Sequence, residues 1–374
     1  MMSLNRVEIS RSALIHNFRV CRQLAGSAAI LPLVKADGYG HGMLDCARIF
    51  ANEGAAAFGV AEAIEGMQLR EAGITQPILV LAGVIPQTLP LIVEAGLTPV
   101  VVDISIVPEL SRLAQARGVT VGVHLKVDAG MGRQGTLPAD FQDLVRAVLA
   151  APSLRLDGVM AHFPLSDNRQ SFNSAEVLRA FRAATAAIGD LVPGKCCLHL
   201  ANSGGLFYVA GARLDMVRPG IALYGYYPDG CEGRDAAAPP LLRPAMRFST
   251  RVVQVRQVPA GKGLGYWHLF TTSRDSRIAV LPVGYEDGYL RVLSNRAKVL
   301  IGGRRAPVVG RISMNLTLVD ITDLPEVRVG DEAVLLGRQG DAEIDADEIA
   351  GWMETISYEV LCLFGKLNER VLVD

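Results

Sequence analysis

The sequence predicts a (β/α)8 TIM-type barrel followed by a C-terminal mainly-β domain, and three observations carry this prediction. Between residue 29 and about residue 218, eight short apolar or β-branched segments alternate with segments of helical period. A stretch rich in glycine and proline follows at residues 226–244. Beyond it, strands are separated by glycine turns. We expect the barrel over residues 1–235 and the mainly-β domain over residues 236–374, with the first residues as a candidate strand of the second domain.

The eight apolar segments are the expected barrel strands, in chain order AILPLV (29–34), AAFGV (56–60), PILVLA (77–82), TPVVV (98–102), VTVGVHLKV (119–127), LRLDGVMAHF (154–163), CCLHL (196–200) and RLDMV (213–217). The clearest helical segments between them are MLDCARIFANEGA (43–55), AEAIEGMQLREAG (61–73), ISIVPELSRLAQARG (104–118) and AEVLRAFRAATAAIGD (175–190). Several end near a glycine, as a left-handed helix C-cap requires. The alternative is an open doubly wound sheet, whose usual GxGxxG fingerprint is absent after the first strand.

The second domain is expected to contain mostly strands. Its segments of alternating or apolar character are AMRFSTRVVQVRQVPAG (245–261), RIAVLPVGY (277–285), RAKVLIGGRRAPVVGRISM (296–314), TLVDIT (317–322) and DEAVLLG (331–337). One helix is expected around DADEIAGWMETI (345–356). This change from alternating strands and helices to consecutive strands marks a second folding unit.

The composition excludes several classes of function. With 37 Lys and Arg against 38 Asp and Glu, the net charge of -1 gives no basic field for nucleic acid or an anionic membrane. The first residues lack the apolar core of a secretory signal, and no stretch has the roughly 20 apolar residues of a membrane span. Six cysteines in 374 residues make no disulfide framework, so we expect a cytoplasmic protein. Cys196, Cys197 and His199 fit a buried strand better than a zinc site, and no metal is expected.

Lys35 stands at the end of an apolar run, where a charged side chain needs an explanation. A lysine at a strand end usually meets solvent. An ammonium drawn partly out of water instead loses basicity, and the amine can then form a Schiff base with an aldehyde. Barrel active sites lie at the C-terminal ends of strands, so polar residues at those ends are expected to share one cavity. Those residues are Lys35, Lys126, Arg133, His162, Asn202, Ser203 and Arg218.

Two glycine-containing segments predict a phosphate site. HLANSGG (199–205) leads from a strand into a helix start, where free N–H groups meet an anion, with Ser203 as a plain N-cap being the alternative. RPGIALYG (218–225) adds glycine amides after the eighth strand, in the usual phosphate region of this barrel. With Lys35 and Arg218, these segments describe a site for pyridoxal 5'-phosphate (PLP). An arginine would leave the pyridine nitrogen unprotonated, which favours proton removal and return over transamination.

Eight segments, taken together and in this order, resemble the alanine racemase family. They are KADGYGHG (35–42), VDAGMGR (127–133), AHFPLSD (161–167), HLANSGG (199–205), RPGIALYG (218–225), GYEDGY (284–289), VGRISMN (309–315) and ISYEV (356–360). The resemblance implies a PLP-dependent isomerase that interconverts L- and D-alanine and supplies D-alanine for cell-wall peptidoglycan. It also implies a head-to-tail homodimer in which each active site takes residues from both chains.

The resemblance assigns roles to individual residues. Lys35 resembles the Schiff-base lysine and one of two catalytic bases. Arg218 resembles the arginine at the pyridine nitrogen, backed by His199, and Arg133 the arginine that contacts the phenolic oxygen and the substrate carboxylate. The further cofactor contacts implied are Tyr39, Asn202, Ser203, Gly220, Ile221 and Tyr358. Tyr285 and Met314 match positions on the substrate side, Met314 through its backbone.

Racemisation needs a second base on the opposite face of the planar carbanion. Aligning LGYWHLFTT (264–272) with the family places this base at Tyr266, supplied by the partner chain, and His162 resembles the histidine beside it. Lys126 resembles a lysine that some members carbamylate, with an ordinary lysine or a bound chloride as alternatives. The chain departs from the family pattern at Asp37, Trp267, His268 and Asn315.

Three other functions remain open from sequence. The same machinery could act on serine or on several small amino acids. A PLP decarboxylase on this architecture would normally pair the pyridine nitrogen with a carboxylate, and Arg218 argues against it. The third alternative is a cofactor-binding protein without catalysis, which exchange of the Cα hydrogen with solvent would distinguish from a racemase.

Overall fold

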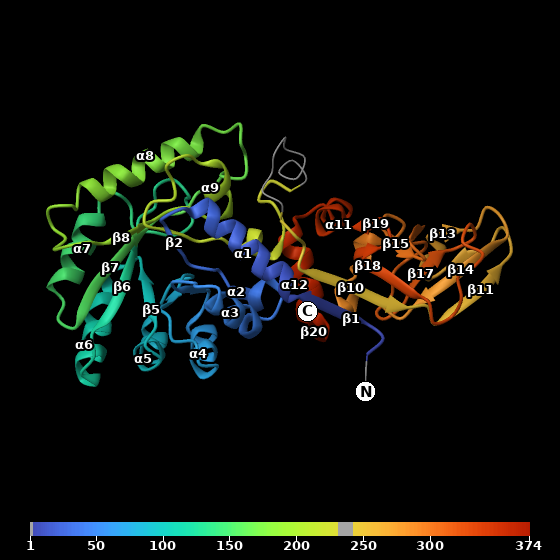
Figure 1. The fold of residues 1–374 in the computed structure, drawn as a ribbon, viewed down its shortest axis with the longest axis horizontal. Coiled ribbons are helices and arrows are strands. Elements are labelled where there is room, and N and C mark those ends of the chain that lie inside the picture. Colours follow the sequence, from blue (N-terminus) through green and yellow to red (C-terminus); the bar gives the residue numbers. More distant parts are fainter. Residues whose placement is uncertain (1–2, 231–241) are drawn as a thin grey trace. The chain divides into compact units, whose positions relative to one another are not determined.

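The structure, a computed structural model, describes residues 3–230 and 242–374 (Figure 1). Its chain forms two compact units. The barrel unit comprises residues 14–38 and 43–242, and the β unit comprises residues 1–13, 39–42 and 243–374. Most of the predicted linker at 226–244, including the expected boundary at 235/236, lies outside the described residues.

In the part of the barrel unit that the structure describes, eight parallel strands form the barrel, one for each predicted segment. They are β2 (Ala29–Ile30), β3 (Phe58–Val60), β4 (Ile78–Val80), β5 (Thr98–Val101), β6 (Val121–Lys126), β7 (Leu154–Met160), β8 (Cys197–His199) and β9 (Met216–Val217). Strands β3 to β8 pair in sequence order, and β2 pairs with β9. Buried parallel strands of this kind read as continuous apolar runs because both of their faces are covered.

Backbone hydrogen bonds at two seams close the ring of strands. The N–H of Val34 donates to the carbonyl of Gly59 at 3.0 Å, which joins the β2 segment to β3. The N–H of Asp215 donates to the carbonyl of Leu198 at 3.0 Å, which joins β9 to β8. The predicted barrel is therefore confirmed, and the open-sheet alternative is wrong.

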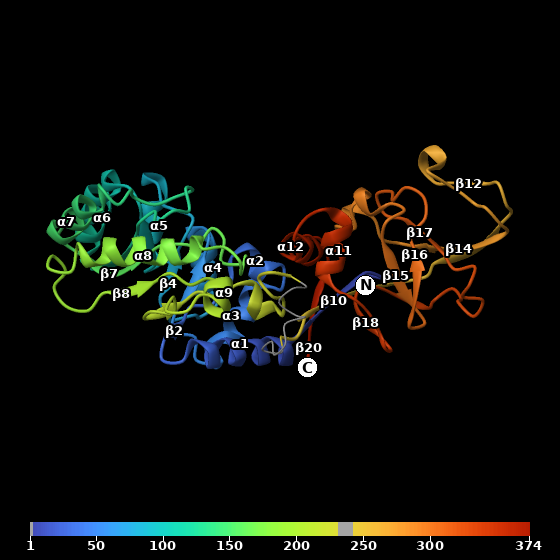
Figure 2. The same ribbon diagram turned by 90° about the horizontal axis from the view of Figure 1, so that it is seen from above.

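The first helix of the barrel unit precedes β2, the other helices follow barrel strands, and together they surround the strands (Figures 1 and 2). They are α1 (Arg11–Ala25), α3 (Met43–Asn52), α4 (Ala63–Glu71), α5 (Leu89–Glu94), α6 (Val107–Arg117), α7 (Phe141–Ala150), α8 (Asn173–Ala186) and α9 (Ser203–Tyr208). Helix α6 ends at Gly118 with φ of 64°, the left-handed conformation that glycine adopts without a Cβ clash. Inside the ring, Gly59 makes room for leucines, because a Cβ there would lie 2.5 Å from Leu33 Cδ2.

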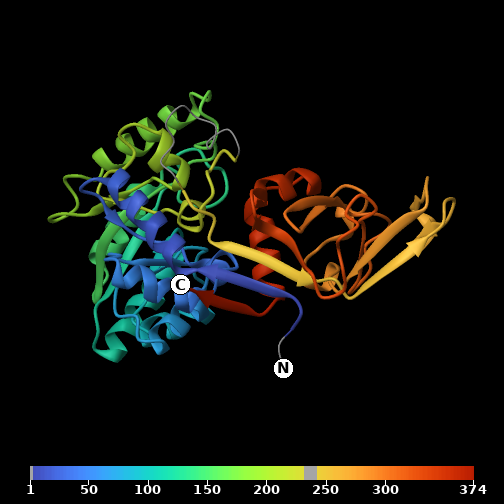
Figure 3. The same cartoon turned by 45° about the vertical axis from the view of Figure 1, so that its right-hand side comes forward.

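The β unit is built on one large sheet with the strand order β16-β15-β18-β10-β1-β20. These strands are β1 (Arg6–Ser10), β10 (Met246–Arg251), β15 (Lys298–Ile301), β16 (Arg304–Pro307), β18 (Glu332–Gln339) and β20 (Arg370–Val373), with β19 (Ala342–Ile344) beside β18. The two ends of the chain meet in this sheet. Strand β1 runs antiparallel to β10 and parallel to β20, seen in Figure 3 as blue between yellow and red.

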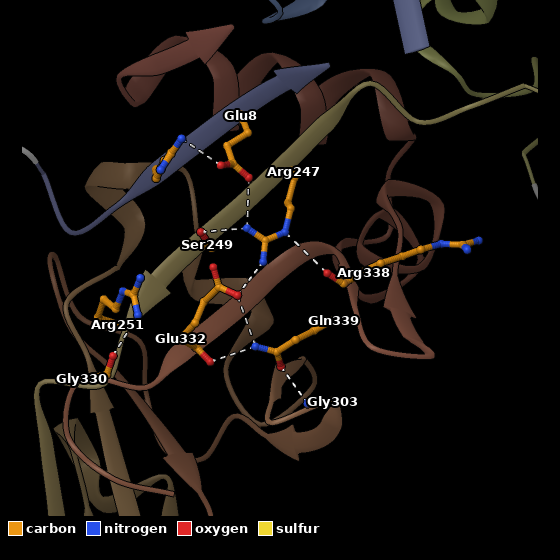
Figure 4. Close-up of polar contacts among 10 residues, drawn as sticks. Glu8, Arg247, Ser249, Arg251, Gly303, Gly330, Glu332, Arg338 and Gln339 are labelled. Carbon is orange, nitrogen blue, oxygen red and sulfur yellow. Dashed lines mark hydrogen bonds and ion pairs between the residues drawn. The ribbon is translucent and has the colours of Figure 1, made fainter. Parts of the chain in front are cut away.

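A polar network covers part of this sheet (Figure 4). The Arg247 guanidinium bridges the strands, at 3.1 Å from Glu8 on β1 and 2.6 Å from Glu332 on β18. Gln339 extends the network by donating to the Glu332 carbonyl at 3.2 Å. Since the two carboxylates come from β1 and β18, the Arg247 guanidinium ties the N-terminal strand to a strand near the end of the chain within the same sheet.

Within the described residues of the β unit, two smaller sheets and two α-helices complete the fold. Strands β11 (Gln254–Val258), β14 (Ser276–Leu281) and β17 (Thr317–Asp320) form one sheet, and β12 (Gly263–Leu264) and β13 (Phe270–Thr271) form a hairpin. The helices are α11 (Ala346–Met353) and α12 (Ser357–Leu367). Leu264 and Phe270 of the hairpin pack on a core cluster that contains Val258 and Ile278, which anchors both hairpin strands. Among the described residues, no helix has the length and apolar character needed to cross a membrane.

Candidate active site

A cavity of about 390 Å³ lies in the barrel unit and collects most of the predicted cations. Its lining contains Leu33, Lys35, Ala61, Leu81, Ala82, Lys126, Arg133, Gln134, Met160, His162 and Arg218. No aspartate or glutamate is present among these described lining residues. A cavity with four Lys or Arg side chains and no carboxylate favours an anionic ligand.

Lys35 enters this cavity from a tightly turned segment. It begins the short helical segment α2 (Lys35–Tyr39), in which Ala36 and Asp37 have φ of 53° and 54°. Such left-handed residues cost roughly 1–2 kcal/mol each, so the surrounding contacts must hold them. The Ala36 N–H donates to Glu65 Oε1 at 2.8 Å, and the Met43 N–H donates to Asp37 Oδ1 at 2.8 Å. Asp37, a departure from the family pattern, is therefore part of the turn that presents Lys35.

Arg218 is the most deeply buried cation of the site, with 1% of its surface exposed. Its guanidinium donates to His199 Nδ1 at 3.0 Å, to His162 Nδ1 at 3.2 Å and to the Ala161 carbonyl at 2.8 Å. Burial lowers the pKa of Arg218 to about 10, which leaves it charged at neutral pH. Both histidines must present an unprotonated Nδ1, because an arginine can only donate.

The two predicted phosphate segments meet in the structure. Ser203 Oγ accepts the N–H of Gly220 at 2.9 Å and the N–H of Ala222 at 3.4 Å, which joins the loops after β8 and β9. Asn202, not Ser203, caps helix α9, since its side chain accepts the Gly205 N–H at 2.8 Å. The N-cap alternative for Ser203 is therefore wrong. Ile221 is fully buried beside Gly220.

Lys126 is buried in the same cavity and has a partner that the sequence interpretation missed. Its Nζ donates to Gln134 Oε1 at 2.9 Å. Burial and the positive charges of Arg133 and Arg218 lower the pKa of Lys126 to about 8. The position of Gln134 directly after Arg133 is the signal that could have indicated this contact.

His124 is the second residue that the interpretation missed. Its Nδ1 lies 2.7 Å from His199 Nε2, and 5% of its surface is exposed. The available signal was the spacing of His124 and Lys126. Residues two apart on a strand point to the same face, so both side chains of β6 face the barrel interior.

The remaining predicted site residues belong to the β unit. Tyr266 opens the single turn η4 (Tyr266–His268) between β12 and β13, with 65% of its surface exposed. Tyr285 opens the turn η5 (Tyr285–Asp287), and its N–H donates to the Ser313 carbonyl at 3.2 Å. The neighbouring Met314 carbonyl accepts the Glu286 N–H at 3.1 Å. These two substrate-side candidates thus lie in adjoining loops.

Tyr39 and Tyr358 lie together in the β unit, with their ring centroids 6.0 Å apart. Burial raises the pKa of Tyr39, so this phenol stays protonated and can donate a hydrogen bond. Asn315, another departure from the family pattern, donates to Glu286 Oε2 at 2.6 Å. The Asn315 amide is uncharged, so it does not neutralise the Glu286 carboxylate. Its hydrogen bond to Glu286 still holds the loop that contains Met314.

Comparisons with known proteins agree with this fold over the whole chain. The family model "Alanine racemase, N-terminal domain" matches residues 9–228, and "Alanine racemase, C-terminal domain" matches residues 245–372. The alanine racemase of Syntrophobacter fumaroxidans is 42% identical over 369 residues, covering 98% of this chain and 96% of the relative. That of Desulfovibrio desulfuricans is 40% identical, with all of both chains covered.

Solved structures give the same result. The alanine racemase of D-cycloserine-producing Streptomyces lavendulae has a TM-score of 0.93 at 32% identity, covering 100% of this chain and 98% of that chain. The Bartonella henselae alanine racemase, solved with covalently bound pyridoxal phosphate, has a TM-score of 0.90 at 28% identity, with 100% of both chains covered. The chain therefore belongs to the alanine racemase family, the PLP-dependent isomerases that interconvert L- and D-alanine.

Proposed function

We propose that this chain binds PLP in the barrel cavity and racemises alanine with two bases, Lys35 and Tyr266. The observation that carries the proposal is the cavity itself, where Lys35 and the buried Arg218 share a lining without carboxylates. The donor set fits the cofactor. Arg218 can only donate, which suits an unprotonated pyridine nitrogen, and the joined loops at Ser203 and Gly220 suit a phosphate.

When bound, PLP supplies an aldehyde that bonds covalently to an amine and a ring that withdraws electrons from the amino-acid Cα. Lys35 provides the amine and holds or returns a proton on one face of Cα. Arg133 orients the substrate carboxylate and the phenolic oxygen. Arg218, braced by His199 and His162, holds the pyridine nitrogen. The proposed cofactor contacts beyond these are Tyr39, Asn202, Ser203, Gly220, Ile221 and Tyr358.

Tyr266 is proposed as the base on the other face of Cα, contributed by the second chain of a homodimer. Tyr266 would take the proton from L-alanine and Lys35 would take it from D-alanine, each returning a proton from its own side. The high exposure of Tyr266 within its own chain supports a role toward a partner. Met314 and Tyr285 would line the substrate side of the same site.

An arginine at the ring nitrogen favours racemisation over the other reactions that PLP can support. A carboxylate there would keep the nitrogen protonated and strengthen the electron sink, which serves decarboxylation and transamination. The donor-only contacts of Arg218 support proton removal and return instead. We also propose that the enzyme is cytoplasmic and supplies D-alanine for peptidoglycan. Residues 1–235 would form the PLP-binding barrel, apart from the first residues, which pair with the second domain, and residues 236–374 would carry Tyr266.

The state of Lys126 is a separate proposal with two alternatives. A carbamylated Lys126 would give Arg133 an anionic partner. An unmodified Lys126 would keep its 2.9 Å hydrogen bond to Gln134 Oε1, and a bound chloride would then be the anion beside Arg133.

The proposal is tested with purified protein loaded with PLP. We expect an absorption band that borohydride removes, with the reduced adduct on Lys35 by peptide mass mapping, and formation of D-alanine with deuterium at Cα from L-alanine in deuterated water. Lys35→Ala should lose both the adduct and the racemisation. Exposed Lys195→Ala is the matched control and should keep both. A wild-type protein that binds PLP but exchanges no Cα hydrogen would contradict the proposed activity.

A further inference from the structure

A chain of three buried side chains runs through the barrel interior behind the candidate site. Arg218 NH1 lies 3.0 Å from His199 Nδ1, and His199 Nε2 lies 2.7 Å from His124 Nδ1. The exposed fractions of these three residues are 1%, 0% and 5%. Of the three, only Arg218 lines the cavity, so His124 can act on the site only through His199.

The donor and acceptor chemistry of the three side chains allows only one direction of hydrogen-bond donation, from Arg218 to His199 to His124. Arg218 only donates, so His199 Nδ1 must accept and carries no proton. A neutral His199 then has its proton on Nε2, from which it donates to His124 Nδ1. His124 in turn carries its own proton on Nε2. The reverse direction would leave His199 without any ring proton, and a neutral imidazole gives up that proton only far above physiological pH.

Burial, together with the positive charge of Arg218, keeps both histidines neutral. Burial, followed by the positive charge of Arg218, lowers the pKa of His199 well below its usual range. Burial also lowers the pKa of His124 to about 4, against the opposing effect of the Asp157 carboxylate. Asp157 forms an ion pair with Arg155 at 2.5 Å and 2.9 Å, which partly balances the negative charge of its carboxylate.

The barrel also makes specific room for His124. Gly158 on β7 stands opposite His124 in the strand register, and a Cβ at Gly158 would lie 2.4 Å from His124 Nδ1. The imidazole occupies this space and meets the His199 ring edge to face, with centroids 4.9 Å apart at 70°. The position of the acceptor Nδ1 is therefore fixed by packing as well as by hydrogen bonding.

We infer that His124 is a positioning residue that fixes the tautomer of His199 and thereby keeps Arg218 oriented as a donor toward the ring nitrogen of the cofactor. The inference rests on the proposed PLP function. Without the acceptor on His124, the Nε2–H of His199 loses its partner inside the barrel. The other tautomer would then place an N–H against the Arg218 guanidinium and displace it.

The test changes the acceptor atom His124 Nδ1 while a side chain still fills the space of the imidazole. His124→Leu removes the acceptor, whereas His124→Asn retains one because Asn Oδ1 can occupy the place of Nδ1. Val123→Ala, on the same strand and fully buried, controls for general weakening of β6. We expect His124→Leu to lower kcat and PLP affinity about tenfold, as for one lost buried hydrogen bond, at a melting temperature near that of Val123→Ala.

Two further readouts separate positioning from a purely structural role. The pH titration of the bound-cofactor spectrum should shift in His124→Leu and return toward wild type in His124→Asn. ¹⁵N NMR of histidine-labelled protein should report Nε2 protonation of His199 in wild type and a mixture of tautomers in His124→Leu. The inference would be overturned if His124→Leu kept the wild-type kcat and spectra. It would also be overturned if His124→Leu and His124→Asn lost kcat and PLP affinity equally. Failure of the wild type to bind PLP or racemise would instead overturn the proposed function.

Discussion

At the scale of single residues, Lys126 is a buried cation surrounded mainly by other cations. Its ordinary pKa of about 10.4 in an unfolded chain falls to about 8 in the folded protein. Folding therefore disfavours the protonated form, and the penalty applies in full below about pH 8. It disappears as the pH rises toward 10.4, so the contribution of Lys126 to stability becomes less unfavourable in that range.

This sign predicts the behaviour of Lys126→Met, which removes the charge and keeps a long side chain. The melting temperature of the variant minus that of wild type should fall by roughly 2–6 °C between pH 7 and pH 10. Scanning calorimetry at both pH values measures this difference. Lys195→Met is the control, since the Lys195 side chain is 85% exposed and its difference should stay constant. A constant difference for Lys126→Met would contradict the lowered pKa.

At the scale of elements, the turn η4 contains a residue whose left-handed backbone conformation is energetically unfavourable. Trp267 has φ of 61°, although only glycine adopts this region freely. Trp267 is 87% exposed, and the centroid of its indole lies 4.9 Å from Arg311 Cζ. Such a cation–π contact is worth about 0.5–1 kcal/mol, so it offsets part of the roughly 1–2 kcal/mol that a left-handed residue costs. The contact therefore fixes the turn that carries Tyr266 without adding much stability.

Trp267→Gly should accordingly reduce the order of the turn that carries Tyr266 while leaving the thermal stability of the protein nearly unchanged. Glycine relieves the backbone cost and loses the indole contact, so the melting temperature should change by less than about 3 °C. The freed turn should lower kcat for L-alanine severalfold, and Arg311→Leu should have a similar effect. Trp352→Phe, the substitution of the other tryptophan, is the matched control and should leave kcat unchanged. A wild-type kcat in Trp267→Gly would show that the contact does not order Tyr266.

Local pattern was sufficient for the barrel strands and insufficient for contacts made across the chain. Segments such as PILVLA and TPVVV predict β4 and β5 because buried parallel strands must be apolar on both faces. No local sequence pattern predicts that β20 lies beside β1, because this pairing joins the two ends of the chain and depends on the fold of everything between them. The same limit applies to the contacts of His124 and Gln134, whose partners became evident only with the barrel closed.

At the scale of the whole molecule, the two proposed bases belong to different units of the chain, Lys35 to the barrel unit and Tyr266 to the β unit. A homodimer that exchanges these units between chains would pair Lys35 of one copy with Tyr266 of the other. In such a dimer a closed two-fold arrangement gives two equivalent sites, each drawing one base from each chain. The two bases should then complement each other between chains.

Lys35→Ala and Tyr266→Ala chains, each inactive alone, are therefore expected to regain activity when they are unfolded and refolded together. Half of the randomly mixed dimers would contain both variants, and one of their two sites would have both bases, so activity should reach about a quarter of wild type. The matched control refolds Lys35→Ala with a chain carrying both substitutions, because no site can then contain Lys35. Racemisation assays and native mass spectrometry measure activity and dimer composition together. Mixed dimers without recovered activity would place both bases within one chain and exclude a shared site.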